Sequence, residues 1–346
     1  MFRRPLTSLF IVVFSLAALG VSGQVGGNYT YAFLNLSPAA RPSGLAQATL
    51  ASVGRDIQFA WLNPALLNSD HRRQIGFSYV NVPGGVGSAE ASYGFGYGDK
   101  HNIMVGFRYL DFGNFVGTDI AGNPTGDFRA SDQLLNGSYS YRLDSNWQFG
   151  GSFKLINSVY ESYNSFGTAI DLAAIYQIPE SRFAFAVIAK NIGVQLVTYA
   201  GQREPLPFEM QFAVSNQFEH LPFRWTVQLE NLQQWDLTYF DPNAVTRDPI
   251  TGEETYDDLN FGEKLLRHVS VSGDLDFKSF NAQLGYSFRA RGEMTIPSRR
   301  TSAGLTYGLG IKLYKFRINY SRKYVHVAGR MHHIGVTVNL DEFGSE

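Results

Sequence analysis

The sequence predicts an all-β fold: a transmembrane β-barrel of fourteen antiparallel strands with a small N-terminal plug segment. Apolar and polar residues alternate with period two in segment after segment from Gln74 onward, and this period is typical of strands. The connections between these segments alternate between short and long. After residue 23 no apolar stretch is long enough for a transmembrane helix. Only helices and closed barrels satisfy all backbone polar groups in lipid, so a membrane location requires a barrel.

The first 23 residues have the order of a secretory signal peptide. Arg3 and Arg4 precede an uncharged apolar run over residues 9–19, and small or modest side chains follow at residues 21–23. We therefore expect cleavage after residue 23, with a mature chain that begins near Gln24. The alternative is an N-terminal anchor helix, for which the run is short.

The composition fits an exported barrel. The chain has no cysteine, 27 Phe, 19 Tyr and 35 Gly, which excludes disulfides and a lipid-modified N-terminal cysteine. Lys and Arg total 29 against 30 Asp and Glu. This near balance gives no reason to expect nucleic acid as a partner. The expected partner of the barrel surface is outer-membrane lipid.

Fourteen segments alternate in this way, and most run for about nine to eleven residues, the length of a tilted membrane strand. We expect the barrel over residues 74–341 and a C-terminal tail over residues 342–346. A secreted β-sandwich would also alternate, but it has no reason to obey the alternation of loop lengths. The expected strands begin at Gln74, Ser88, His101, Leu134, Trp147, Thr168, Arg182, Phe208, Arg224, His268, Asn281, Thr306, Lys315 and His332.

The expected long connections cover residues 81–87, 111–133, 160–167, 193–207, 233–267, 290–303 and 324–331. Short turns of one to six residues lie between them. In an up-and-down outer-membrane barrel, short turns face the periplasm and long loops face outward. We therefore expect the cell outer membrane, with both termini in the periplasm.

Residues 24–73 do not alternate and are the expected N-terminal periplasmic or plug segment. A short helix is expected over residues 44–50. Asn63 is a good N-cap and Pro64 a good first helical residue, so residues 64–67 are expected to form one helical turn. The candidate plug residues are Asp56, Trp61, Asn63 and Pro64. The alternative is a disordered or barrel-capping leader.

The sequence contains no catalytic constellation, so we expect no enzyme, no cofactor and no metal site. His332 and His333 are adjacent on a strand and point to opposite faces, which prevents them from sharing a metal simply. The glycine-rich stretch over residues 94–98 lies in a strand with no helix after it, so barrel glycines explain it better than phosphate binding.

The connection over residues 233–267 is the longest, and a long ordered surface loop is where a partner docks. A short amphipathic helix is expected over residues 261–266. The acidic residues of this loop permit calcium binding, although their spacing is not that of an EF-hand, and solvated charge is the simpler explanation. The candidate docking residues are Trp235, Tyr239, Phe240, Asp241, Tyr256, Asp257, Asp258 and Phe261.

The N-terminal part contains a series of short motifs: residues 31–36 (YAFLNL), 40–41 (AR), 44–45 (GL), Asp56 and 63–67 (NPALL). These motifs, and the C-terminal residues 320–333 as well, resemble the PorQ family, outer-membrane proteins of the type IX secretion system in Bacteroidota. Asn-Pro-Ala alone is shared with FadL-type fatty-acid channels and PorV barrels. The chain departs from the barrel pattern by ending without an aromatic residue, although Phe343 is close.

The resemblance implies a FadL-like barrel that is a non-catalytic component of the attachment complex. Its implied partner is PorZ, and through PorZ the sortase PorU and its barrel PorV, which process cargo and join it to lipopolysaccharide. Two alternatives stay open: a FadL-like outer-membrane channel for hydrophobic molecules, and PorV-like binding of cargo. The small polar faces expected inside the barrel favour the membrane anchor over the channel.

Overall fold

The computed structural model describes residues 29–238, 246–247, 254–255, 259–294, 302–326 and 329–343. The expected signal peptide over residues 1–23 and the last three residues of the expected tail lie outside these ranges.

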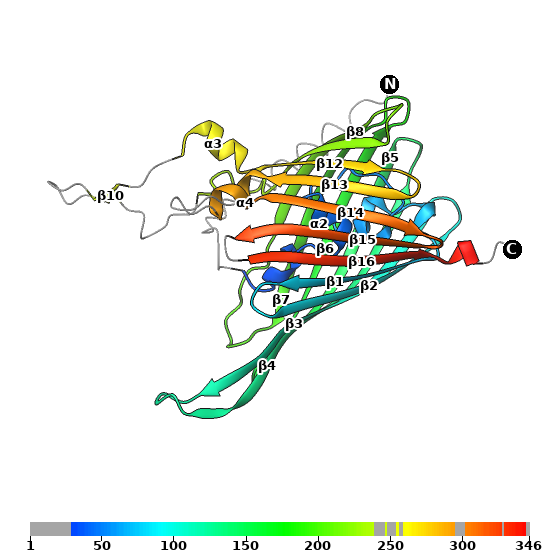
Figure 1. The fold of residues 1–346 in the computed structure, drawn as a ribbon. Coiled ribbons are helices and arrows are strands. Elements are labelled where there is room, and N and C mark those ends of the chain that lie inside the picture. Colours follow the sequence, from blue (N-terminus) through cyan, green and yellow to red (C-terminus); the bar gives the residue numbers. More distant parts are fainter. Residues whose placement is uncertain are drawn as a thin grey trace, which may run out of the picture.

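The fold is a closed antiparallel barrel of fourteen strands, as predicted (Figure 1). Each strand pairs with the next along the chain, β9 pairs with β12, and β1 pairs with β16 to close the barrel, with Gln74 opposite Asn339. Closure leaves the wall without a free edge, which is what a sheet in lipid requires. The strands are β1 (Gln74–Val82), β2 (Val86–Tyr97), β3 (His101–Thr118), β4 (Pro124–Arg142), β5 (Trp147–Tyr160), β6 (Tyr163–Ile178), β7 (Phe183–Val197), β8 (Glu209–Gln217), β9 (Phe223–Leu229), β12 (Val269–Asp276), β13 (Phe280–Ser287), β14 (Leu305–Leu313), β15 (Phe316–His326) and β16 (Gly329–Asn339).

The wall has an apolar outer face and a mainly polar inner face, because the alternation of the sequence follows the pleat. On β1, Phe77 and Tyr79 point outward and are 52% and 50% exposed, whereas Ser78 between them is buried. An apolar exterior on a closed barrel is the surface that a bilayer covers. Further exposed apolar residues on the wall include Tyr93, Phe95, Val105, Phe107, Leu135, Phe153, Leu172, Leu284, Leu309 and Ile334.

Several connections are shorter than the sequence predicted because the strands continue. The predicted loop over residues 111–133 is wrong: β3 runs to Thr118 and β4 begins at Pro124. The ladder continues through glycine-rich residues because cross-strand pairs such as Phe115 with Phe128 support it. The connections β1–β2, β5–β6 and β15–β16 likewise shrink to residues 83–85, 161–162 and 327–328.

The two ends of the barrel still differ in their connections. Six connections of two to five residues lie at one end, which we call the short-turn end. The opposite end, the loop end, has four connections of two to five residues and the three long ones, over residues 198–208, 230–268 and 288–304, so the predicted alternation of short and long connections holds only in part. The loop end also holds β10 (Thr246–Arg247), β11 (Glu254–Thr255), α3 (Phe261–Leu266) and α4 (Phe288–Glu293). The helix predicted over residues 261–266 is therefore confirmed, and Asn260 and Glu263 form its capping box.

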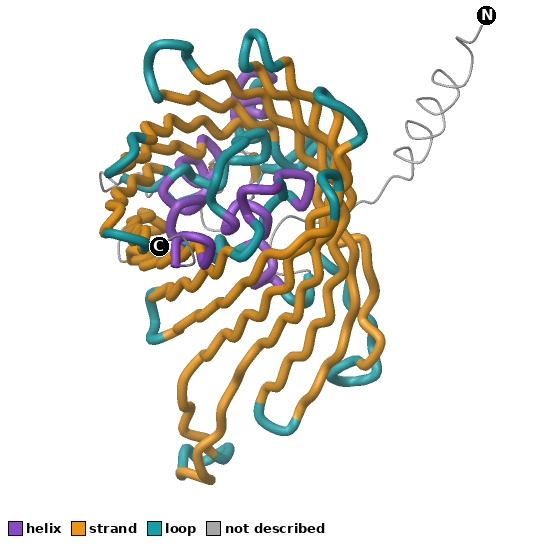
Figure 2. Tube along the Cα trace, turned by 90° about the vertical axis from the view of Figure 1, so that its right-hand side faces the viewer, coloured by secondary structure: helices purple, strands orange, loops and turns teal. Residues whose placement is uncertain are grey.

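The N-terminal segment, residues 29–73, lies inside the barrel (Figure 2). It forms short helical turns: η1 (Ala32–Asn35), α2 (Ala40–Gly44), η2 (Ile57–Trp61), η3 (Pro64–Leu66) and η4 (Ser69–His71). A last turn, η5 (Leu340–Phe343), follows β16. No helix in the described ranges is long and apolar enough to cross a membrane.

Of the two helical turns predicted in this segment, one is confirmed. The turn at Pro64 forms as expected, with the side chain of Asn63 accepting a hydrogen bond from the backbone N–H of Ala65. The helix predicted over residues 44–50 is wrong. Ala46 and Gln47 have left-handed φ angles of 53° and 63°, so the chain turns there, and the helix lies earlier, at α2.

Candidate functional site: the filled lumen and the loop end

A buried cluster of charges joins the N-terminal segment to the barrel wall. Nη2 of Arg41 on α2 donates to Oδ2 of Asp274 at 2.9 Å and to Oδ2 of Asp276 at 2.7 Å. Its Nη1 lies 3.9 Å from Oδ2 of Asp56. Burial alone would lower the pKa of Arg41, but the three carboxylates raise it above its ordinary value. Arg41 is therefore charged and held between β12 and its own segment.

A second arginine joins the wall to the segment in the opposite direction. Arg108 on β3 is buried, and its Nη1 donates to the backbone carbonyls of Phe33 at 3.2 Å and Leu36 at 3.0 Å. Its Nε donates to the hydroxyl of Ser88 on β2. The guanidinium carbon lies 5.8 Å from the centre of the Phe33 ring, within the range of a cation–π contact. The carbonyls at the end of η1 are thereby satisfied by the wall.

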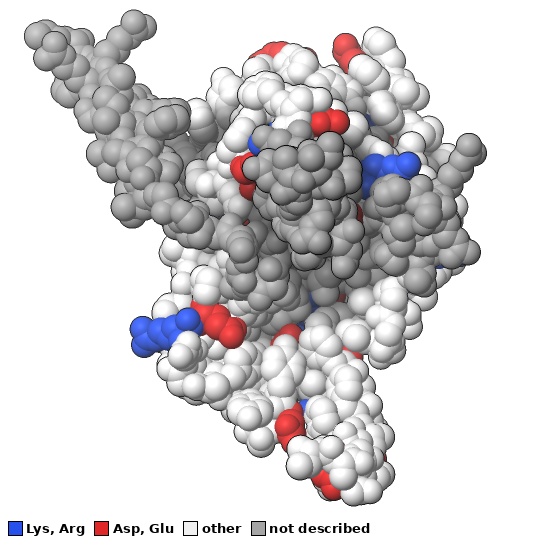
Figure 3. Space-filling model, turned by 90° about the vertical axis from the view of Figure 1, so that its left-hand side faces the viewer, with Lys and Arg blue, Asp and Glu red and all other residues white. Residues whose placement is uncertain are grey.

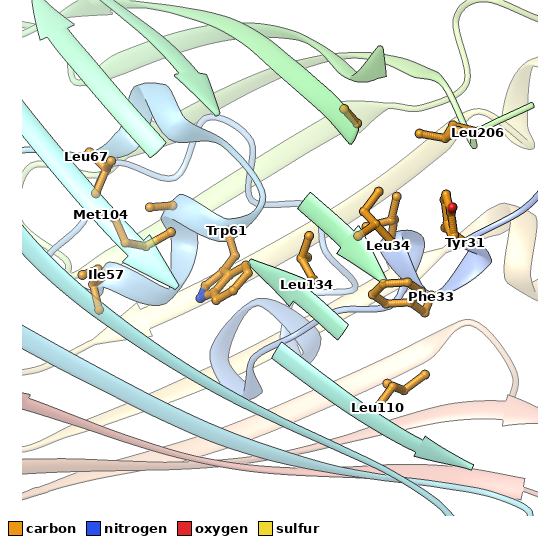
Figure 4. Packing of buried hydrophobic residues seen from close by; sticks show 13 residues of the cluster. Tyr31, Phe33, Leu34, Ile57, Trp61, Leu67, Met104, Leu110, Leu134 and Leu206 are labelled. Carbon is orange, nitrogen blue, oxygen red and sulfur yellow. The ribbon is translucent and has the colours of Figure 1, made fainter. Parts of the chain in front are cut away.

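Two apolar clusters fill the space between the segment and the wall. The first packs Tyr31, Phe33, Ile57 and Trp61 against side chains of β3 to β6, including Met104 (Figure 4). The second packs the segment against an apolar patch inside β6, β7 and β8, and its members are Leu45, Leu50, Ala51, Phe59, Ala65, Leu66, Ala173, Ile175, Ala184, Ala186, Ile188 and Ala213. The lumen therefore has a packed core.

The connection between β7 and β8 also turns into the barrel. Leu206 belongs to the first apolar cluster, and the carbonyl of Pro205 accepts from the backbone N–H of Thr30 at 3.1 Å. The carbonyl of Pro207 accepts from the side chain of Asn191, which in turn accepts from Lys154. This loop thus covers the start of the N-terminal segment from the loop end.

The four candidate plug residues are all buried in this segment. Asp56 accepts from the backbone N–H of Gln58 at 3.1 Å and caps η2. The amide of Asn63 donates to the carbonyl of Leu50 at 2.7 Å. The Trp61 indole and the Pro64 backbone lie against wall glycines where a side chain would overlap them, at Gly106 and Gly150. These residues position the segment, and its role as a plug stays a prediction.

Of the three carboxylates around Arg41, Asp56 was a candidate plug residue, whereas Asp274 and Asp276 were not among the candidate residues of the sequence analysis. Asp274 and Asp276 are two positions apart on one strand, so both point inward. Two carboxylates on the lumenal face of one strand are a signal for a buried cation. The distance between that strand and Arg41 cannot be inferred from the sequence, so the pair was not identified there.

A polar cavity of about 220 Å³ lies at the short-turn end. The segment, β1, β14, β15, β16 and the C-terminal turn η5 surround it. Lys312 and Glu342 form an ion pair of 2.8 Å at its rim. The residues that line it are Arg55, Asp56, Asp70, Gln74, Lys312, Lys315, Arg317, Thr337, Asn339 and Glu342.

At the loop end, two of the candidate docking residues come together. The rings of Trp235 and Phe261 lie 5.4 Å apart, and Trp235 stacks on His268 at 5.4 Å. Both Trp235 and Phe261 are exposed. Tyr239, Phe240, Asp241, Tyr256, Asp257 and Asp258 lie outside the described residues.

The base of this aromatic cluster is held by charge. Asp236 forms an ion pair of 3.1 Å with Lys264 on α3. Hydrogen bonds from Thr238, together with Lys264, lower the pKa of Asp236 to about 2. Asp236 is therefore ionised, and it ties the start of the long loop to α3.

The structure separates the two adjacent histidines. His333 is buried and lies 3.2 Å from the hydroxyl of Ser43, whereas Nδ1 of His332 lies 2.7 Å from the hydroxyl of Tyr320. Among the described residues there is no group of three or more His, Cys, Asp or Glu that could hold a metal ion.

The chain matches no protein-family model and has no significant match among curated proteins. Among solved structures it is similar to a FadL homologue of Pseudomonas aeruginosa, with 11% identity over 87% of this chain and 98% of that chain and a TM-score of 0.49. It is also similar to the Pseudomonas putida toluene transporter TodX, with 11% identity over 76% and 86% and a TM-score of 0.43. A third is the KdgM porin, with 7% identity over 77% and 98% and a TM-score of 0.34.

Proposed function

We propose that the chain is a non-catalytic outer-membrane component of the type IX secretion system that holds the surface protein PorZ. Through PorZ it would stand near the sortase PorU and the barrel PorV, where cargo is processed and joined to lipopolysaccharide. The name of the system and of the partners comes from the resemblance of the N-terminal residues to the PorQ family.

The filled lumen is the observation that carries this proposal. Arg41 and Arg108 hold the N-terminal segment to opposite parts of the wall, and two apolar clusters occupy the space between them. Extracting a buried ion pair and an apolar core from their partners costs several kcal/mol. A barrel filled in this way offers its surface to a partner rather than its interior to a solute, and the larger surface features are at the loop end.

Affinity purification of the tagged chain in mild detergent tests the proposal. Recovery of PorZ with the barrel supports the anchor. Recovery of cargo or PorU without PorZ would overturn it in favour of a PorV-like role.

A FadL-like channel for hydrophobic molecules is the second candidate, and the inner wall gives one reason for it. Ala186 and Ile188 on β7 and Ala213 on β8 belong to an apolar patch that the N-terminal segment covers. If the segment withdrew, this patch would face the lumen. Uptake of a hydrophobic solute by liposomes that contain the purified chain separates the two candidates. Ligand-specific flux would contradict the proposal that the chain is only a membrane anchor.

A further inference from the structure

A two-stranded hairpin projects beyond the barrel wall. It is formed by residues 111–129 of β3 and β4, and we call it the β3–β4 hairpin (Figure 1). On one side, β2 pairs with β3 only as far as Gly87 opposite Asp111. On the other side, β5 pairs with β4 only from Tyr160 opposite Ala130. Beyond these points, β3 and β4 pair only with each other among the described residues.

The hairpin is a built element with its own internal contacts. A bulge between Asp111 and Asn114 changes the register at its base, where the carboxylate of Asp111 accepts from the N–H of Gly113 at 2.9 Å. At its tip the carboxylate of Asp119 accepts from the N–H groups of Ala121 and Asn123, both at 2.9 Å. The hydrogen bonds at its base and tip are thus made within the hairpin itself.

The hairpin presents two strand edges and exposed apolar side chains. Each edge carries alternating backbone N–H and C=O groups that no strand of the described chain satisfies. Val116 is 65% exposed, and Phe115 and Ile120 are exposed as well. Natural proteins usually blunt or cover such edges, and an open edge is the template for an added strand.

The charge of the hairpin restricts the amino-acid composition of a strand that could be added to it. Residues 111–129 contain three aspartates and one arginine, a net charge of −2. Arg129 is engaged, because its Nε donates to the side chain of Asn114 at 2.8 Å. Acidic surface is visible on the hairpin, at the bottom of Figure 3. An incoming strand with basic residues matches this surface, and an acidic strand would be repelled.

We propose that the β3–β4 hairpin is a docking edge on which a partner protein adds a β-strand of alternating apolar and basic residues. Backbone hydrogen bonds supply the pairing, the exposed side chains of Val116 on β3 and of Ile120 in the turn at the tip contact the apolar residues of the added strand, and the aspartates select its basic residues. The inference rests on the proposed function, since it names the surface that the held partner uses.

Synthetic peptides test the docking edge directly. The probe is a fluorescent ten-residue peptide of alternating Val and Lys, added to the full chain in lipid nanodiscs. The controls are the same peptide with Glu in place of Lys, and a version interrupted by Pro, which cannot donate to a ladder. We expect the Val-Lys peptide to bind at least about tenfold more tightly than either control. Equal binding of the Pro-interrupted peptide would show attraction by charge alone and would overturn the proposal.

Two variants of the chain complete the test. In the first, Asn-Gly replaces residues 112–130 and joins the paired residues Asp111 and Ser131 by a two-residue turn. In the second, Val116→Lys and Ile120→Lys change the exposed side chains and leave the backbone intact. Both variants are expected to lose binding of the Val-Lys peptide, while heat-modifiable migration on gels shows that the barrel is still folded. Unchanged binding by the shortened chain would overturn the docking edge.

The purification experiment separates this inference from the proposed function. If the intact chain recovers PorZ and the shortened chain recovers as much, the docking edge is wrong and the anchor stands. If the intact chain recovers no PorZ, the anchor itself fails. A dimer of the chain that disappears when the hairpin is shortened would also overturn the proposal, because a second copy would then be the occupant.

Discussion

Arg41 and Asp274 form a buried ion pair of 2.9 Å although 233 positions separate them in the sequence. Arg41 is only 2% exposed. Asp274 belongs to β12 of the wall, and Arg41 to the short helix α2 inside the barrel. One contact thus fixes where the N-terminal segment lies against the barrel, and its removal leaves buried charge without compensation.

Replacement of this arginine is expected to loosen the N-terminal segment. Arg41→Met leaves Asp274, Asp276 and Asp56 without their shared cation, which costs about 3–5 kcal/mol when one partner of a buried pair is lost. The expected result is rapid cleavage within residues 29–73 by an added protease, read by mass spectrometry. The barrel itself is expected to keep its heat-modifiable migration on gels.

Arg317→Met is the matched control for this change. Arg317 also pairs with Asp276, at 2.9 Å, but both side chains are partly exposed. Exposed ion pairs contribute at most about 1 kcal/mol to stability. The N-terminal segment of the Arg317→Met variant should therefore remain protected from the protease. Equal cleavage of the two variants would contradict the role assigned to Arg41.

The stability of the segment is expected to fall in mild acid because of His71. Burial lowers the pKa of His71 to about 4, although Asp56 and Asp70 act in the opposite direction, and its Nδ1 accepts from the N–H of Asn68 at 3.1 Å. The folded segment therefore holds the neutral ring, whereas the unfolded segment takes up a proton as the pH falls below 6.5. The stabilisation is complete above pH 6.5 and is lost towards pH 4, by about 1.4 kcal/mol per unit.

Proteolysis of the native chain and of His71→Gln at pH 7.5, 6 and 5 measures this effect. Carboxylates titrate in both proteins, so the difference between the two profiles isolates His71. The cleavage rate of the native chain is expected to rise more steeply than that of His71→Gln as the pH falls. Parallel profiles would show that His71 does not control the acid response.

Close packing between Trp61 and Gly106 gives a third prediction. A methyl group at Gly106 on β3 would overlap the indole of Trp61. Gly106→Ala is therefore expected to cost about 1–3 kcal/mol, the range for overpacked cores. Trp61→Leu should relieve the overlap, so the double variant is expected to be less destabilised than the sum of the single changes. Urea unfolding of the segment measures both.

Gly137→Ala is the control for this pair, because a methyl group there meets no atom within 4 Å. It is expected to leave the unfolding curve unchanged. Additive effects of Gly106→Ala and Trp61→Leu would contradict the direct contact.

The strand count and the confirmed helical turn could be predicted from local pattern alone. Period-two alternation is a property of neighbouring residues, and Asn63-Pro64 carries its capping information within two positions. The β3–β4 hairpin was not predicted, because Gly113, Asn114 and Pro124 are typical of loops. There the pairing of Phe115 with Phe128 across the strands overrides local preference.

The path of the N-terminal segment could not be predicted, because distant contacts determine it. Local preference favoured a helix from Gly44, but the chain turns at Ala46 and Gln47, and a methyl group at Gly285 on β13 would overlap the backbone nitrogen of Ala46. The alternation of apolar and polar residues predicts that Asp274 points inward, but it does not predict that Arg41 is the partner of Asp274. No periodicity in the sequence relates residues that meet only after the barrel closes.

The aromatic cluster at the loop end is expected to contribute to docking. Trp235 and Phe261 are exposed, and their rings lie 5.4 Å apart on a base held by Asp236 and Lys264. Rigid exposed aromatic residues are the side chains that most often supply about 2 kcal/mol or more at protein interfaces. Replacing both by Ala should therefore lower the recovery of PorZ in affinity purification by at least about tenfold. Tyr97→Ala is the control, because Tyr97 is 82% exposed but lies at the short-turn end. Equal recovery by the two variants would place docking elsewhere on the loop end, and loss of recovery with Tyr97→Ala alone would place the partner at the opposite end of the barrel.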